Sequence, residues 1–123
     1  MKTTYMDYSA TTYVKPEVLD AMMPFFTEKF GNPSSFYGIP RETKMAVDNA
    51  RAQVAKAINC DPNEVYFTGG GSEADNWAIK GAAHAAPDGR NRIVTTKIEH
   101  HAVLHTCEAL KSEGFDVIYV GVD

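Results

Sequence analysis

The residues best placed to do chemistry are three consecutive glycines between an apolar tetrapeptide and a helix-forming run. Val65–Thr68 favours a strand, Gly69, Gly70 and Gly71 follow, and Ser72–Asn76 favours a helix. Glycines leave the backbone amides unscreened by Cβ atoms. The first amides of a helix lack internal partners and carry the positive end of its dipole. A strand, a bare turn and a helix start therefore predict a seat for an anion, most often phosphate.

Gly71 and Ser72 are the predicted phosphate-binding residues, through their amides and the Ser72 hydroxyl. A structural alternative stays open, because Ser72 also stands where an N-cap belongs and Asp75 follows at capping-box spacing. Glu73 and Asn76 are expected to organise the turn. The glycines match neither the Walker loop nor the Rossmann fingerprint, so the turn alone does not identify a nucleotide site.

His100 is the second candidate, because it follows the next predicted strand by a few residues. An imidazole there could cover an aromatic ring or move a proton near neutral pH. It could equally be a structural hydrogen-bonding group. His101 and His105 are spaced i, i+4, but no third ligand has matching spacing, so no metal site is predicted.

Two cysteines, Cys60 and Cys107, show no paired spacing, which predicts no disulfide and a reducing, cytoplasmic setting. Both are interpreted as packing residues. A net charge of −4 argues against a nucleic-acid partner. Neither a bilayer-spanning apolar run nor a signal peptide is visible, which predicts no membrane association.

The elements that must position these residues form an alternating pattern. Pro24 interrupts the first helical pattern and is expected to kink or divide it. Alternation of strand and helix predicts a parallel sheet with right-handed crossovers. Ligands of such sheets lie beyond the carboxyl ends of the strands, where both candidates fall. The predicted strands are 65–68, 92–96 and 115–120, and the predicted helices are 41–58, 72–86 and 102–112, the last ended by Gly114.

Four ordered motifs carry a resemblance to a known family. Residues 67–76, Phe-Thr-Gly-Gly-Gly-Ser-Glu-Ala-Asp-Asn, closely resemble the phosphate-binding motif of the NifS/IscS cysteine desulfurases. Asp7–Thr12, Gly31–Ser35 and Ile98–Val103 are similar to three further motifs of that family, in the same order. These enzymes belong to the class V aminotransferase group and bind pyridoxal 5′-phosphate (PLP) on a fold-type I architecture.

The resemblance implies an α/β fold: part of a PLP fold-type I large domain, with a mainly parallel sheet, flanking helices and preceding N-terminal helices. Residues 1–123 would be the N-terminal segment and the incomplete first part of the PLP-binding domain. Residues 1–40 would form an arm, helix and loop, and 41–123 the α/β part with the phosphate turn. Gly71, Ser72 and His100 would bind the cofactor, and His100 would also be catalytic.

The resemblance further implies conversion of L-cysteine to L-alanine, with sulfur passed to an enzyme cysteine as a persulfide for iron–sulfur cluster or thio-cofactor synthesis. The family's Schiff-base lysine lies in a Ser-x-His-Lys motif, and no His-Lys pair occurs here. The catalytic lysine and cysteine are therefore expected from a missing part or second chain, and this chain alone is expected to be inactive. A homodimer and a sulfur-acceptor protein are the implied partners. The alternatives are a selenocysteine lyase, another class V PLP enzyme, or a truncated non-catalytic partner.

Overall fold

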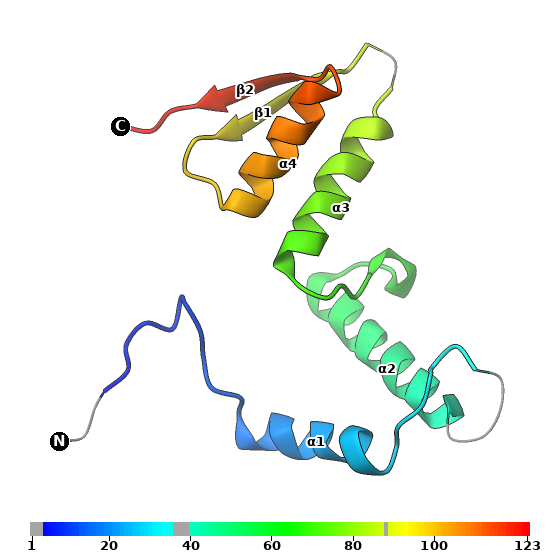
Figure 1. Cartoon of the computed structure of the whole chain (residues 1–123). Helices are drawn as coiled ribbons and strands as arrows, with labels where there is room; N and C mark the ends of the chain where they lie inside the picture. Colours follow the sequence, from blue (N-terminus) through cyan, green and yellow to red (C-terminus); the bar gives the residue numbers. More distant parts are fainter. Residues whose placement is uncertain (1–3, 36–39, 88) are drawn as a thin grey trace. The chain divides into compact units, whose positions relative to one another are not determined.

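The computed structural model describes residues 4–35, 40–87 and 89–123, so part of the predicted loop before residue 40 lies outside it. The chain forms two compact units, Met1–Tyr66 and Phe67–Asp123, which are described separately. Their elements are labelled in Figure 1. The predicted division at residues 40 and 41 remains a prediction. No helix in the described ranges has the length and apolar character needed to cross a bilayer.

The first helix of the first unit is α1, Pro16–Thr27. Pro16 suits the first turn because its missing N–H would have no helical partner there. Pro24 lies inside α1, which continues to Thr27, so the expected division of the helix at this proline is wrong. At the C-terminal end of the helix, the Pro24 carbonyl accepts hydrogen bonds from the Glu28 and Lys29 amides at 2.9 and 2.7 Å. None of the residues of α1 is buried.

The second part of this unit packs around α2, Pro40–Ile58, and the short 3-10 helix η1, Pro62–Glu64. Ala55 and Val65 are buried, and the Arg51 guanidinium donates to the Val65 carbonyl. Asp61 and Glu64 form a capping box around η1. These contacts fix the segment that leads out of the unit.

The strand predicted at residues 65–68 does not form, which corrects the sequence interpretation. Val65 has an extended backbone, with φ −99° and ψ 122°, but a strand also needs a neighbour for its amides and carbonyls. The sheet in the described part of the chain has two strands, neither of which pairs with residues 65–68. The composition of residues 65–68 favours a strand, but no strand of the described sheet pairs with them.

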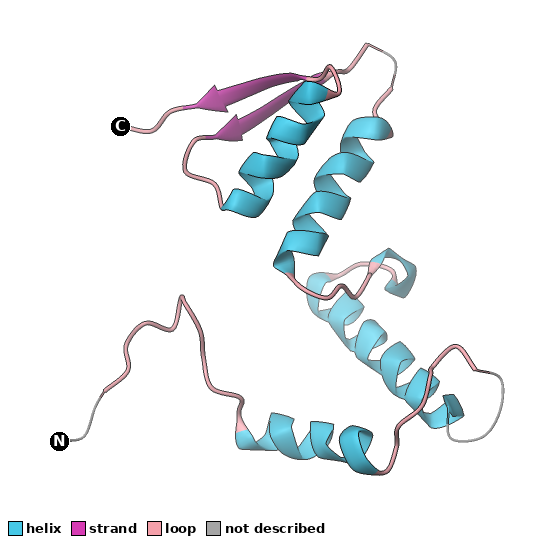
Figure 2. Ribbon diagram, viewed as in Figure 1, coloured by secondary structure: helices cyan, strands magenta, loops and turns pink. Residues whose placement is uncertain are grey.

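The second unit is the predicted alternation of helix and strand (Figures 1 and 2). Strands β1 and β2 pair in parallel, with Ile93 opposite Val117. The predicted mainly parallel α/β fold is confirmed for this unit. Gly114, with φ +102°, follows α4 as the predicted helix terminator. The elements are α3 (Gly71–His84), β1 (Arg92–Thr96), α4 (His101–Ser112) and β2 (Asp116–Val120).

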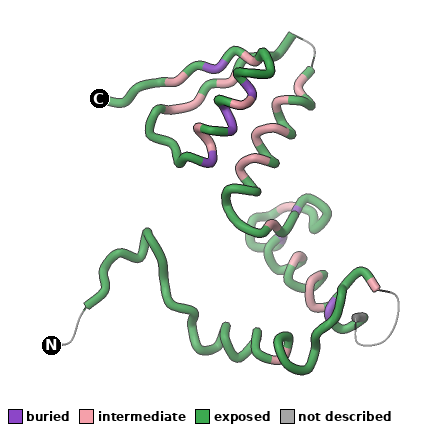
Figure 3. The backbone as a smooth tube through the Cα atoms, in the orientation of Figure 1, coloured by how far each residue is buried: buried purple, intermediate pink, exposed green. Residues whose placement is uncertain are grey.

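The core of the second unit lies between α4 and the sheet. Leu110, Cys107 and Thr106 of α4 are almost fully buried, and Val117 is buried on β2, which packs against α4. Figure 3 shows the buried positions of this unit on α4 and β2. Helix α3 lies beside α4. Packing therefore fixes α4, and with it the residues at the start of α4.

Candidate functional site

The glycine turn leads directly into α3. Gly70 is the N-cap, with extended backbone angles of φ 165° and ψ 173°, and Gly71 is the first helical residue. The first helical hydrogen bond joins the Ala74 amide to the Gly70 carbonyl at 3.1 Å. The amides of Gly71, Ser72 and Glu73 precede it and have no helical partner.

The space in front of this turn is open. A Cβ atom placed on Gly70 or Gly71 would meet nothing within 4 Å, and both residues are exposed. The two glycines are therefore not required by contacts with the described residues. They leave room for an external group to approach the amides.

Ser72 does not cap the helix, so the capping-box alternative is wrong. The cap is Gly70, two residues earlier, and Ser72 lies within the first turn. Its carbonyl accepts from the Asn76 side-chain amide at 2.9 Å. The Ser72 hydroxyl forms no hydrogen bond within the described ranges, which leaves it available to a ligand.

Glu73 and Asn76 organise the turn as predicted. The Gly69 amide donates to Glu73 Oε2 at 2.6 Å, and Asn76 makes its bond to Ser72. The sequence indicated Gly69 as part of the bare turn but did not predict its bond to Glu73. The signal was the spacing, because a carboxylate four residues after a turn amide can reach back to it.

His100 stands at the start of α4 and is its N-cap. Its Nδ1 accepts from the Ala102 amide at 3.1 Å, so the neutral ring carries its proton on Nε2. The sequence did not reveal this capping role, because imidazole is not among the preferred N-caps. The His101 ring lies 6.3 Å from that of His100 and 5.3 Å from that of His105. No group of three or more metal-ligating side chains forms in the described ranges.

The two predicted ligand-binding elements meet at one end of the second unit. Figure 1 shows α3 and α4 starting at the same end, where β1 reaches its carboxyl end. Thr96, the last residue of β1, donates its hydroxyl to Glu99 Oε1 at 2.9 Å and so holds the segment before His100. Two helix N-termini thus bring their positive dipole ends to this edge.

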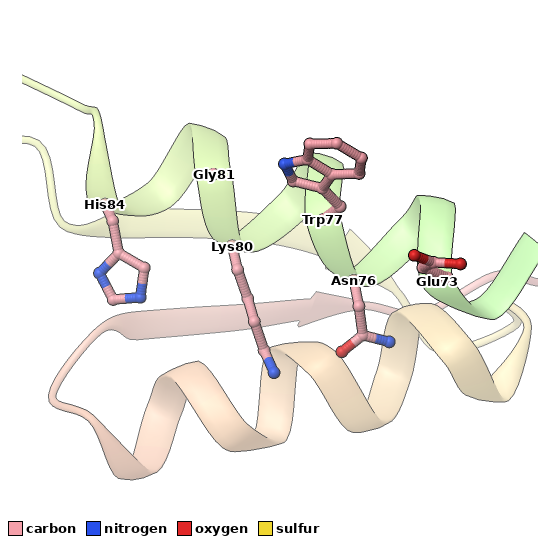
Figure 4. Close-up of a pocket in the computed structure, with 6 residues that line it drawn as sticks. All are labelled: Glu73, Asn76, Trp77, Lys80, Gly81 and His84. Atoms are coloured by element: carbon pink, nitrogen blue, oxygen red, sulfur yellow. The ribbon is translucent and has the colours of Figure 1, made fainter. Parts of the chain in front are cut away.

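A separate hollow of about 430 Å³ runs along α3. Glu73, Asn76, Trp77, Lys80, Gly81 and His84 line it. Figure 4 shows Asn76, Lys80 and His84 on one side of α3 and Trp77 on the other. None of Gly71, Ser72 and His100 lines this hollow, so it is not the predicted phosphate seat.

Neither cysteine is placed for nucleophilic chemistry. Cys107 is 1% exposed in the core of the second unit, and Cys60 is half-buried after α2. Burial, with a smaller contribution from the Glu99 carboxylate, raises the pKa of the Cys107 thiol. A raised pKa keeps the thiol protonated and unreactive.

Comparison with known proteins covers nearly the whole chain. The model of the family "Aminotransferase class-V" matches residues 4–123. A cysteine desulfurase IscS of Clostridium botulinum (strain Hall) is 63% identical over 122 residues, which are 99% of this chain and 31% of that protein. The cysteine desulfurase IscS of Methanosarcina thermophila is 55% identical, covering 99% of this chain and 30% of that protein. The chain thus spans about a third of the length of these relatives.

Two solved structures share the fold. A NifS-like protein superposes with a TM-score of 0.83 at 41% identity, covering 90% of this chain and 30% of that one. A structure described as SspA in complex with cysteine gives a TM-score of 0.86 at 40% identity, covering 96% of this chain and 34% of that one.

Proposed function

Since this chain belongs to the aminotransferase class-V family, we propose that it supplies the phosphate seat and a ring partner to a PLP-dependent cysteine desulfurase. The observation that carries the proposal is the shared end of α3 and α4, where the first amides of α3 and the exposed N-cap residue His100 of α4 lie at the same end of the parallel sheet. Relatives with 55 to 63% identity carry the name cysteine desulfurase.

The residues present fit the phosphate of PLP. A phosphate dianion needs several donors and open space, and the Gly71 and Ser72 amides lack helical partners. Nothing lies within 4 Å of a Cβ placed on Gly71. The Ser72 hydroxyl adds a third donor. The α3 dipole favours the negative charge at this position.

His100 is proposed to cover the cofactor ring and to move protons there. The bond from the Ala102 amide fixes the imidazole through Nδ1, and Nε2 keeps the transferable proton. The side chain is exposed, so a ring can approach it. When bound, PLP supplies an electron sink for an amino-acid substrate.

The proposed substrate is L-cysteine, supported by the related structure described as a complex with cysteine. The substrate C–S bond breaks, L-alanine leaves, and the sulfur joins an enzyme thiol as a persulfide. Cys107 is too buried for that role, and Lys80 and Lys97 match no lysine motif of the family. The lysine and the thiol therefore belong to polypeptide beyond these 123 residues.

The complete enzyme is proposed to be a cytoplasmic homodimer. It would pass sulfur to an acceptor protein for iron–sulfur cluster or thio-cofactor synthesis. The IscS names of the relatives support this assignment.

A chimera tests the proposal. This chain replaces the matching 122 residues of the Clostridium botulinum relative, and alanine released from L-cysteine is measured together with sulfide, which a thiol reductant in the assay frees from the persulfide. We expect release by the chimera and its loss in the His100→Ala variant. A folded, PLP-loaded chimera that is inactive on L-cysteine but releases selenide from L-selenocysteine would replace the proposal with a selenocysteine lyase.

A further inference from the structure

We propose that Glu73 is a positioning residue that holds the glycine turn in the form that presents the Gly71 and Ser72 amides to phosphate. This inference rests on the proposed function. Glu73 would not touch the cofactor. It would act through the Gly69 amide, which lies two residues before the first of the amides proposed to bind phosphate.

The contact that carries the inference is short and specific. The Gly69 amide donates to Glu73 Oε2 at 2.6 Å, and hydrogen bonds to an ionised acceptor are shorter and stronger than those between neutral groups. A Cβ on residue 69 would lie 3.2 Å from the same oxygen, closer than most real contacts of a Cβ. A side chain at position 69 would therefore require the Glu73 carboxylate to shift by a few tenths of an ångström, whereas nothing crowds Gly70 or Gly71.

Hydrogen bonds within the chain occupy some of the backbone amides of the turn and leave others available to a ligand. The Gly69 amide donates to the Glu73 carboxylate, and the Ala74 amide donates to the Gly70 carbonyl at 3.1 Å. The Thr68 hydroxyl donates to the Gly70 carbonyl at 3.2 Å, which holds the turn from its entry side. The amides of Gly71 and Ser72 lie between these fixed points and remain for the ligand.

The charge of Glu73 has two opposing effects. A carboxylate in the first turn stabilises α3 through the dipole, but it also repels an incoming dianion. Replacing Glu73 by glutamine keeps an acceptor for Gly69 and removes the repulsion. Replacing it by alanine removes both. A purely electrostatic role would make both variants bind phosphate more tightly, whereas a positioning role separates them.

The test is a titration of the full chain with inorganic phosphate, followed by the NMR shifts of the Gly71 and Ser72 amides. We expect Glu73→Ala to weaken binding about fivefold, comparable with the loss of a helix cap. Glu73→Gln should bind at least as tightly as the natural chain. Asp75→Ala is the matched control, because it removes a carboxylate from the same helix without touching Gly69, and it should not weaken binding.

The outcomes separate the two proposals. If phosphate moves neither amide in the natural chain, the proposed phosphate seat is wrong, and this inference falls with it. If the natural chain binds and Glu73→Ala binds equally or more tightly, only the positioning role is overturned. Hydrogen exchange of the Gly69 amide gives a second readout, which should accelerate in Glu73→Ala and not in Asp75→Ala.

Discussion

At the scale of single residues, His100 combines a structural task with a proposed chemical one. Its Nδ1 caps α4, while the rest of the exposed ring remains accessible. Capping and ring stacking need different parts of the side chain, so a substitution can separate them. Asparagine is a preferred N-cap without an aromatic ring.

We therefore predict different results for two His100 variants. His100→Asn should keep the stability of the chain, and His100→Ala should lower it by about 1 kcal/mol because the α4 cap is lost. Both should abolish activity in the chimera. Urea unfolding and the alanine-release assay provide the two measurements. An active His100→Asn chimera would show that the ring is dispensable.

Ser72 allows a simpler prediction, because its hydroxyl is not used by the helix. Ser72→Ala should leave the melting temperature unchanged and weaken PLP binding in the chimera about tenfold, the usual effect of losing one hydrogen bond to a charged group. Absorbance titration with PLP measures the affinity. A fall in stability without a change in PLP affinity would contradict this prediction and show that Ser72 has a structural role.

At the same scale, the sequence predicted approximately where the two helices begin, but not which residues cap them. Gly71 and Ser72 were placed within one residue of a predicted helix start, and His100 two residues before another; in the structure α3 begins at Gly71 and α4 directly after His100. The N-cap is Gly70, two residues before Ser72, and a shift of this size changes which side chain can reach the first amides of the helix. The roles of these residues as ligands remain predictions.

At the scale of elements, strand propensity predicted a strand correctly where a second strand of the same chain is there to pair with it. The runs at 92–96 and 116–120 pair with each other, so both became strands. Residues 65–68 have similar composition, but the sheet in the described ranges consists of β1 and β2 alone, so these residues do not form a strand. Local sequence encodes the preference, whereas pairing depends on residues distant in the chain.

The α4–β2 core gives the stability prediction for this scale. Leu110 is fully buried, so Leu110→Ala should cost about 2–5 kcal/mol through lost burial and an unfilled cavity. Leu19→Ala is the matched control, because Leu19 on α1 is 46% exposed and its truncation should cost much less. Urea unfolding followed by circular dichroism compares them. Equal losses would mean that the α4–β2 interface is not the stabilising core.

Cys107 in the same core predicts selective thiol chemistry. The pKa of Cys107 is raised in the folded state from its ordinary value of 9.0, mainly by burial. Because the folded protein holds the thiol proton more tightly than the unfolded chain, the free energy of unfolding is unaffected by this group below about pH 9. It falls as pH rises from there through the folded pKa. At pH 8, iodoacetamide should label Cys60 before Cys107, as peptide mass spectrometry would show. Early labelling of Cys107 would indicate frequent opening of α4.

At the scale of the whole molecule, large apolar side chains remain exposed in both units. In the second unit, the sheet face turned away from α4 carries Val94 at 62%, Ile118 at 40% and Val120 at 47% exposure. Parallel sheets are normally covered on both faces, so this face lacks its usual second layer within the described ranges. Val94 and Ile118 pair across β1 and β2, which makes the patch continuous.

We predict that the isolated chain self-associates through such surfaces. Sedimentation should show an average mass that rises with concentration, and the chain should bind the dye ANS, because exposed apolar patches drive association. The double variant Val94→Thr and Ile118→Thr keeps the β-branched side chains that strands prefer while reducing the apolar area. It should lower both ANS binding and association without unfolding the sheet.

In the chimera, residues from the rest of the enzyme would cover this face, so the same double variant should instead reduce the stability of the chimera. A natural chain that stays monomeric and binds no ANS at high concentration would show that this face is not adhesive.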